Sequence, residues 1–307
     1  MNAAMHKVDI KPNAPDVAAV HTVETLVASP KFMECLTFCN ETLLSIHQQL
    51  PREVRYVADM RRWIMTHGAL KLNFAHQLDS RSPALTASNL YREVVHTGAV
   101  SPNTVTNYLK EIEHLGYIEA LPRGDRRLRA YRMSAFSEHM FYHYLTVHLN
   151  GLDILDGHKR SDAAQSDPKI LTHMHPVFAS LMLKDAAYYH PPASIAPLVH
   201  STVGISVLNE MTRKADSEYY DEKEKVSVSL DSANAMAQRY GTSRGNIARL
   251  LTKVRAAGDY GQSDNGHWVS KQLLQEYYRW QAGKLVNIST AYAHAFKARE
   301  ISRVNTV

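Results

Sequence analysis

A cluster of arginines toward the end of the first half of the chain could bind phosphate groups. Residues 123–132 contain five arginines against one acid, and the six residues are Arg123, Arg126, Arg127, Arg129, Arg132 and Asp125. Guanidinium groups pair with phosphate oxygens through two parallel N–H donors, and they also enter narrow DNA grooves. An arginine-rich turn can equally be a solvated hairpin that binds nothing. The secondary structure expected around the turn is therefore needed to distinguish these two interpretations.

Short polar side chains precede the arginines at helical spacing. Ser101 followed by Pro102 is typical of a helix N-cap with proline in the first turn. An apolar residue then recurs every three or four positions between Val105 and Leu115, which predicts a helix with one buried stripe. The opposite face carries Asn103, Thr104, Asn107 and Lys110. Side chains of this size can hydrogen-bond base edges and phosphates without holding a helix out of the major groove.

The flanking elements place both groups in one unit. Residues 88–96 favour a first helix, and Gly98 ends it before the capped helix. Two short strands, 117–121 and 128–133, enclose the arginine turn, and a long helix is expected over residues 134–155. This order predicts a winged helix-turn-helix, in which the second helix enters the major groove and the hairpin lies along the backbone or minor groove. The DNA interpretation of the arginines is therefore favoured, and in this half we expect DNA contacts from Ser101, Asn103, Thr104, Asn107, Lys110, Arg123, Arg126, Arg127 and Arg129.

The second half of the chain repeats this order with a different placement of charge. Residues 233–240 predict a first helix, Gly241 a turn, and Asn265-Gly266 a hairpin turn. Cations crowd the helical region, whereas the hairpin tip, 263–266, has none. The cations are Arg239, Arg244, Arg249, Lys253 and Arg255. In this half we expect DNA contacts from Ser243, Arg244, Asn246, Arg249 and Lys253.

Two pairs of segments indicate a tandem duplication. Ser29-Pro30-Lys31 matches Asp167-Pro168-Lys169 at a separation of 138 residues, and each opens a helical pattern. Residues 100–109 match residues 242–251 at a separation of 142. Two matches in the same order at nearly the same spacing favour a repeated unit over chance similarity.

The first unit resembles the MarR family of prokaryotic winged-helix regulators. The resemblance covers residues 86–155, and it rests on the capped helix, the sequence Gly116-Tyr117-Ile118, and the wing sequence Gly124-Asp125-Arg126-Arg127. It implies that Arg126 and Arg127 reach the minor groove while Asp125 steadies an arginine. The second unit has the helix-turn-helix pattern without the Asp-Arg-Arg wing, so its minor-groove contact is in doubt.

Members of this family act as dimers joined through their terminal helices, so two units in one chain imply a fused, pseudo-symmetric dimer. The long helices 136–155 and 271–296 would then form the central interface together with the helices that open each repeat. The resemblance also implies a small aromatic effector bound between the halves, although core packing is the default role of aromatic residues. The candidate lining residues are Tyr188, Tyr189, Tyr219, Tyr220, Tyr277, Tyr278 and Trp280.

Composition excludes several classes of protein. The 307 residues are 45% hydrophobic and 21% charged, which is typical of a folded globular chain, and a net charge of +5 permits a polyanionic partner. No run of about 18 apolar residues predicts a membrane span, and the first 15 residues lack the pattern of a secretory signal. Cys35 and Cys39 cannot form a disulfide framework, so we expect a cytoplasmic, nucleoid-associated protein.

No catalytic or metal-binding pattern stands out. Several of the 17 histidines gather between His173 and His200, but the pair His173 and His175 does not have a helical ligand spacing. Cys35 and Cys39 share a helix face and could sense oxidation, although simple packing is favoured. Nucleotide-binding and hydrolase motifs are missing from the sequence. We therefore expect no enzyme activity, no cofactor and no metal, and a solvated loop over the acidic run 216–224.

The predicted fold is mainly α with small β-hairpin wings, built from two winged helix-turn-helix units joined through long helices as a pseudo-symmetric fused dimer. The expected divisions are a flexible arm (1–28), unit one (29–156), a linker (157–167) and unit two (168–307). The predicted function is sequence-specific binding of double-stranded DNA at two unequal half-sites in transcription regulation. Alternatives are a plasmid-type replication initiator, or an interaction module that docks RNA polymerase or another regulator. No membrane partner is expected.

Overall fold

The chain folds into a mainly helical structure with two small antiparallel sheets. The computed structural model describes residues 20–49, 59–122, 129–201, 203–213, 215–220, 225–264 and 266–304. These residues confirm the coarse fold class expected from the sequence.

In the first half, helices precede and follow a two-stranded hairpin. The elements are α1 (Val23–Val27), α2 (Phe32–Gln49), α4 (Met60–Leu78), α5 (Ala87–Val94), the short 3-10 helix η1 (Val95–Thr97), α6 (Pro102–His114), β1 (Ile118–Ala120), β2 (Tyr131–Met133) and α7 (Ala135–Asp156). Strand β1 pairs antiparallel with β2, with Ile118 opposite Met133. Leu85 forms an isolated bridge to Tyr131, which ties the segment before α5 to the hairpin.

In the second half, the sheet has four strands. The elements are α8 (Arg160–Ser166), α9 (Lys169–Lys184), α10 (Ala186–Tyr189), α11 (Ala196–Val199), α12 (Gly204–Arg213), β3 (Ala215–Tyr220), β4 (Lys225–Val228), α13 (Ala233–Arg239), α14 (Arg244–Ala256), β5 (Tyr260–Ser263), β6 (Gly266–Ser270) and α15 (Lys271–Val304). The strand order is β3-β4-β6-β5. Thus the order helix, capped helix, hairpin, long helix occurs once in each half.

Local sequence explains why α6 and α14 begin and end alike. Their caps, Ser101 and Ser243, each accept a hydrogen bond from the backbone N–H three residues on, at 3.2 and 3.1 Å. Each helix is followed by a glycine in the left-handed region, Gly116 at φ 75° and Gly258 at φ 84°. A side chain there would be strained, so glycine fixes the point where each helix turns into its hairpin.

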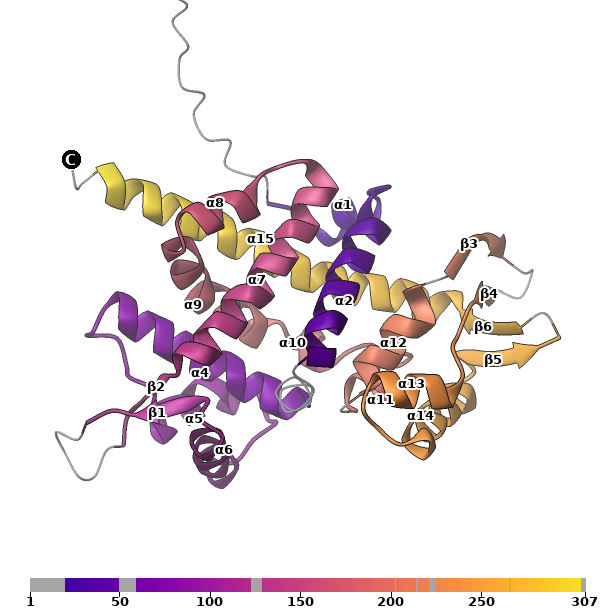
Figure 1. The fold of residues 1–307 in the computed structure, drawn as a ribbon, viewed down its shortest axis with the longest axis horizontal. Helices are drawn as coiled ribbons and strands as arrows, with labels where there is room; N and C mark the ends of the chain where they lie inside the picture. The colour runs from indigo at the N-terminus through magenta and orange to yellow at the C-terminus, as the bar shows by residue number, and fades with distance from the viewer. Residues whose placement is uncertain are drawn as a thin grey trace, which may run out of the picture.

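Long helices form the centre of the molecule. Figure 1 shows α15 running through the whole structure, with α7 and α2 crossing it. Helix α9 packs against both α4 and α15, which joins the two halves. The long helices and α9, which opens the second repeat, therefore contribute to the centre as expected, whereas the sequence did not indicate that α4 would join the two halves.

Two segments expected to be loosely attached or extended are packed instead. The predicted arm reaches residue 28, but α1 packs on α15 and Leu26 is 0% exposed. The predicted linker 157–167 contains helix α8, in which Arg160 is 1% exposed. Arg160 is drawn inward because Asp153 and Asp156 on α7 accept its hydrogen bonds. Residues 1–19 lie outside the described residues.

The acidic run 216–224 was expected to be a solvated loop, and this expectation is wrong for its first part. Residues 216–220 belong to strand β3, which pairs with β4 and thereby extends the hairpin β5–β6. Residues 221–224 lie outside the described residues. The sequence did not indicate a strand here because acidic residues, which disfavour strands, precede Tyr219 and Tyr220, which favour them.

Helices α2 and α7 approach closely at Gly151, and we expect substitution there to be costly. A methyl group on Gly151 would lie 2.4 Å from the Cys39 sulfur and 3.1 Å from the Cys35 sulfur. Gly151→Ala should therefore lower the free energy of unfolding by about 1–3 kcal/mol, measured by urea denaturation. The double variant Gly151→Ala/Cys39→Ala should recover most of the loss. Equal stability of the wild type and Gly151→Ala would contradict this explanation.

Candidate nucleic-acid interface and the pocket behind it

Helix α6 presents the predicted polar face to solvent. Asn103, Asn107 and Lys110 follow one another at steps of four and three residues, so they share one face, and all three are exposed. No hydrogen bond from these three side chains to another described residue is found. Thr104 is half-buried, and its hydroxyl lies 2.9 Å from that of the cap, Ser101. Ser101 and Thr104 thus fix the start of the helix, while the other three are available to a partner.

Helix α4 contacts α6 through a hydrogen bond and an ion pair. The Thr66 hydroxyl lies 2.9 Å from the Tyr108 hydroxyl in a buried contact, and Arg62 forms an ion pair with Glu111 at 3.1 Å. Burial raises the pKa of the Tyr108 phenol, so the phenol keeps its proton at neutral pH. These contacts fix the rotation of α6, which keeps its polar face outward.

The arginine-rich hairpin is only partly described. Arg123, Arg126 and Arg127 lie outside the described residues, so their DNA contacts stay predictions. Arg129 is described, and its guanidinium donates to Glu113 at the end of α6 and lies 5.6 Å from the centre of the Tyr131 ring. A phosphate that bound Arg129 would have to compete with Glu113. Arg132 is likewise paired, with Glu119 at 2.8 Å.

Helix α14 presents cations where α6 presents amides. Arg244, Arg249 and Lys253 are exposed, and none forms an ion pair with a described acid. Arg249 shares a face with Gly245 and Thr252, and the other two cations flank that face. Asn246 is half-buried and donates to the Thr242 hydroxyl at 3.1 Å. Among the residues expected to contact DNA, Ser243 and Asn246 are thus occupied in shaping the helix start.

Helix α12 supports this unit as α4 supports the other. Glu210 on α12 is buried, and its carboxylate accepts hydrogen bonds from Arg239 and from the Tyr240 hydroxyl, each at 2.8 Å. Arg239 also pairs with Asp231. Arg239, one of the cations that crowd this region of the sequence, is therefore neutralised by Asp231 and by Glu210 on another helix.

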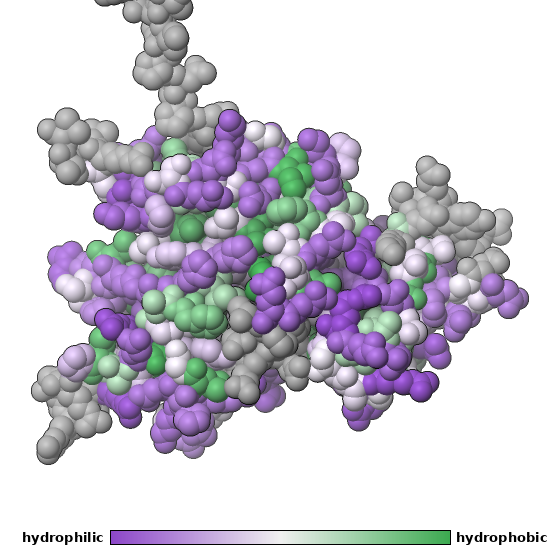
Figure 2. Space-filling model, viewed as in Figure 1, coloured by the Kyte–Doolittle hydropathy of each residue, from purple (hydrophilic) through white to green (hydrophobic). Residues whose placement is uncertain are grey.

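The two units lie toward the same side of the molecule. Figure 1 shows α6 and its hairpin at the lower left and α14 with its sheet at the lower right. On the face shown in Figure 2, strongly hydrophilic residues gather over α13 and α14. This arrangement allows one elongated partner to touch both units.

One of the histidines considered for a metal site and both cysteines considered for oxidation sensing are packed in the core. Among the described residues, no group of three or more His, Cys, Asp or Glu side chains could hold a metal ion. His175 is buried and stacks on Phe74 at 4.3 Å between ring centres. Cys35 and Cys39 are buried free thiols that face Gly151. Packing thus accounts for both cysteines.

A pocket of about 200 Å³ lies between the halves and is lined by residues of both. Of the seven aromatic residues considered for an effector site, Tyr188 and Trp280 line it. Tyr277 is buried and hydrogen-bonds to Asn209 at 2.5 Å, Tyr278 packs edge-on against Phe32, and Tyr189 packs against His190. The side chains of Tyr219 and Tyr220 lie outside the described residues.

Sequence reasoning missed most residues of this pocket, among them Trp63, Glu210 and Lys284. One signal was present for Lys284, which lies on the buried stripe of α15 between Tyr277, Gln281 and Ile288 at helical spacing. A lysine at such a position is unusual because burial penalises its charge. Trp63 and Glu210 gave no comparable signal, since their role depends on contacts between distant helices.

None of the helices in the described part of the chain combines the length and the apolarity that a membrane span requires. Comparisons with protein-family models, with curated proteins and with solved structures give no match.

Proposed function

We propose that this protein is a transcription regulator that binds double-stranded DNA in the cytoplasm through two winged helix-turn-helix units. The units would derive from a tandem duplication and grip two unequal half-sites. One observation carries the proposal: α14 exposes Arg244, Arg249 and Lys253, which have no described acidic partner. Uncompensated cations on the exposed face of a capped helix are the electrostatic signature of a phosphate-binding surface.

The inequality of the half-sites follows from the two surfaces. The polar face of α6 exposes two amides and one lysine, whereas α14 exposes four cations, Arg244, Arg249, Lys253 and Arg255. Asparagine side chains pair with adenine and arginine side chains with guanine in the major groove. The two units would therefore prefer different bases, with α14 supplying more of the affinity and α6 more of the hydrogen bonding.

Removal of the charges of Arg244, Arg249 and Lys253 on α14 is expected to weaken DNA binding strongly. A preferred duplex is first selected from a random pool at about 150 mM salt, and its affinity is then measured by fluorescence anisotropy. The variant Arg244→Ala/Arg249→Ala/Lys253→Ala should bind this duplex about 100-fold more weakly. Because three phosphate contacts are lost, the slope of log affinity against log salt should become shallower by about 2.7.

A variant with the same change of net charge separates a local effect from a general one. Lys31, Lys159 and Lys169 are exposed and belong to the segments around α2, α8 and α9, so Lys31→Ala/Lys159→Ala/Lys169→Ala should bind almost as the wild type does. Equal weakening by both triple variants would remove α14 from the interface. If the selection enriches no sequence, the prediction that this chain alone binds specific DNA sequences is wrong.

A further inference from the structure

The pocket between the halves contains a buried amine without an acidic partner. Lys284 on α15 is 8% exposed, and its Nζ makes no hydrogen bond or ion pair with any described residue. The titratable groups whose charges act on it are the buried thiols of Cys35 and Cys39 and the buried imidazole of His148, and none of these is a carboxylate. An ammonium group without a counter-charge is costly in a protein interior, so this site favours a reaction that removes the charge.

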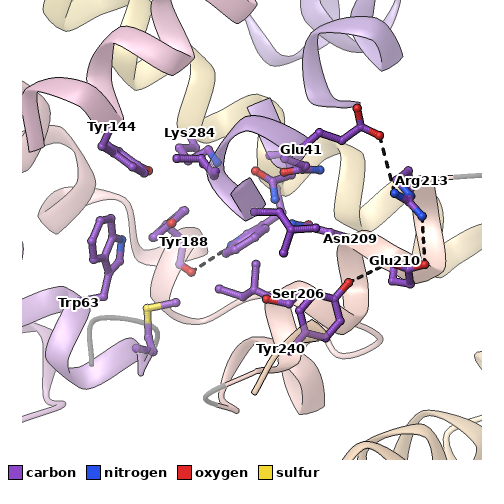
Figure 3. A pocket seen from close by; sticks show the side chains of 17 residues that line it. Glu41, Trp63, Tyr144, Tyr188, Ser206, Asn209, Glu210, Arg213, Tyr240 and Lys284 are labelled. Carbon is purple, nitrogen blue, oxygen red and sulfur yellow. Dashed lines mark hydrogen bonds and ion pairs between the residues drawn. The ribbon is translucent and has the colours of Figure 1, made fainter. Parts of the chain in front are cut away.

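The carboxylates of the pocket are paired with arginines. Glu210 lies 3.1 Å from Arg213 and 2.8 Å from Arg239, and Glu41 reaches Arg213 at 3.7 Å. Figure 3 shows these charges on one side of the pocket and aromatic rings on the other, with Lys284 between them. The Glu41 side chain is 57% exposed, so the pocket opens to solvent at this end. A small molecule can therefore enter the pocket from solvent.

Aromatic rings give the pocket a fixed apolar wall. Trp63 and Tyr144 meet edge to face with ring centres 5.5 Å apart, and Tyr188 stacks on Trp280 at 4.9 Å. The Trp280 indole donates to the Tyr188 carbonyl at 3.0 Å, which holds this pair in place. The pocket measures about 200 Å³, and an apolar protein cavity of about 150 Å³ holds a benzene molecule. An apolar body of about five or six carbon atoms therefore fits beside Lys284.

We propose that Lys284 forms a reversible imine with a small apolar aldehyde, whose carbon chain lies among Trp63, Tyr144 and Tyr188. The lone pair of the neutral Nζ attacks the carbonyl carbon, and a proton passes from the nitrogen to the oxygen. Loss of one water molecule then leaves a C=N double bond, so nothing is oxidised or reduced, and hydrolysis reverses the step. Because a neutral imine replaces a buried ammonium group, the product avoids the desolvation cost that the free lysine carries. This site does not depend on the proposed function.

Part of the Lys284 amine is in its reactive form at neutral pH. Burial lowers the pKa of the ammonium group to about 8, so about a tenth of the amine is neutral at pH 7. An ordinary exposed lysine is neutral to only about 0.04% at this pH. An amine of lower pKa is also a weaker nucleophile, which offsets part of this advantage. Lysines desolvated in apolar pockets are nevertheless the ones that form imines with carbonyl compounds.

Reductive trapping with pentanal tests the proposal on the folded wild-type protein without DNA. At pH 7, sodium cyanoborohydride reduces the imine to a stable secondary amine, and peptide mass spectrometry measures the initial rate of modification at each lysine. Lys284 should react at least about tenfold faster than the exposed Lys169 and Lys297. This preference should vanish when the chain is unfolded in guanidinium chloride, because it depends on burial. Modification of folded Lys284 no faster than that of Lys169 would overturn the proposal.

A comparison of two aldehydes separates binding in the pocket from reactivity alone. Pentanal and propanal carry the same reactive group and differ by two methylene groups. Pentanal should modify Lys284 about tenfold faster than propanal, because the aromatic wall removes these two groups from water. Lys169 should react equally with both aldehydes, since it is exposed. Equal rates at Lys284 would show that the pocket does not bind the carbon chain, which contradicts the proposal.

The variant Lys284→Met assigns the fast reaction to one residue. It should retain only slowly modified lysines, whereas Lys297→Met, which removes an exposed lysine from the same helix, should keep the fast site. A fast site that persists in Lys284→Met would refute the assignment. If Lys284→Met does not fold, the rates at single lysines of the wild type still decide. Fast modification of Lys284 in a chain that selects no DNA sequence would uphold this proposal while the proposed function fails.

Discussion

Acidification from pH 7 to pH 5 is expected to remove about 5–6 kcal/mol from the free energy of unfolding. Three imidazoles, His67, His148 and His175, are buried in the centre of the molecule. Burial lowers the pKa of His67 and of His175 to about 3, and burial together with the Lys284 charge lowers the pKa of His148 well below its usual value. In the unfolded chain all three would bind protons near pH 6.5.

The direction of this effect follows from where the protons bind. Below pH 6.5 the unfolded state takes up about three more protons than the folded state, so stability falls by about 4 kcal/mol per pH unit. This fall continues until the pH approaches the pKa of about 3 of folded His67 and His175. Above pH 6.5 the three histidines contribute their full stabilisation. Because domains are stable by only about 5–15 kcal/mol, the fold should be lost between about pH 5 and pH 4. Urea denaturation at a series of pH values measures the slope.

Replacing two of these imidazoles with rings that cannot bind a proton tests the explanation. His175 lies almost parallel to Phe74, at 9°, and His67 packs edge-on against Phe178 at 5.3 Å, so phenylalanine can occupy either site. His67→Phe/His175→Phe should lower the slope to about one proton. The control His139→Gln/His143→Gln removes two exposed imidazoles from α7 and should keep the original slope. An unchanged slope in the buried variant would assign acid sensitivity to other groups.

The elements of both candidate DNA-binding units could be predicted because their signals are local. Ser101 and Ser243 are caps, Gly116 and Gly258 end the helices, and an apolar residue every three or four positions gives the buried stripe. The exposure of Asn103 and Arg249 then follows from helical geometry alone. The sequence does not show whether an arginine on these elements is paired with an acid. Arg239 and Arg129 are neutralised by acids that lie elsewhere in the fold.

The pocket could not be predicted because its lining comes from helices α2, α4, α7, α10, α12 and α15 together with Tyr240 after α13. No spacing in the sequence relates Trp63 to Glu210 or Lys284. Helix α8 was missed for a related reason. Residues 157–167 have the composition of a linker, and only the position of Asp153 and Asp156 on the preceding helix turns Arg160 inward. Burial of polar residues depends on partners, which composition does not reveal.

Arg160→Met is expected to lower the free energy of unfolding by about 3–5 kcal/mol. The Arg160 guanidinium donates to Asp153 at 3.1 Å and to Asp156 at 2.8 and 2.5 Å. Asp156 also lies 2.8 Å from His21, which fastens the N-terminal segment to α7. Although burial alone would raise the pKa of Asp156, the bonds to Arg160 lower it to about 2, so the carboxylate is charged in the native state. Without Arg160, two mostly buried carboxylates would lack their main counter-charge.

This cost should come from the carboxylates left behind rather than from lost packing, because methionine fills much of the volume of arginine. Arg160→Met/Asp153→Asn/Asp156→Asn should therefore be more stable than Arg160→Met alone at pH 7, since neutral amides are far cheaper to bury. The Arg160 and Ser161 backbone N–H groups donate to different oxygens of Asp153, and Asp153→Asn retains one of these two oxygens, so the start of α8 keeps one acceptor. Equal stability of the single and triple variants in urea denaturation would show instead that the loss arises from packing around α8.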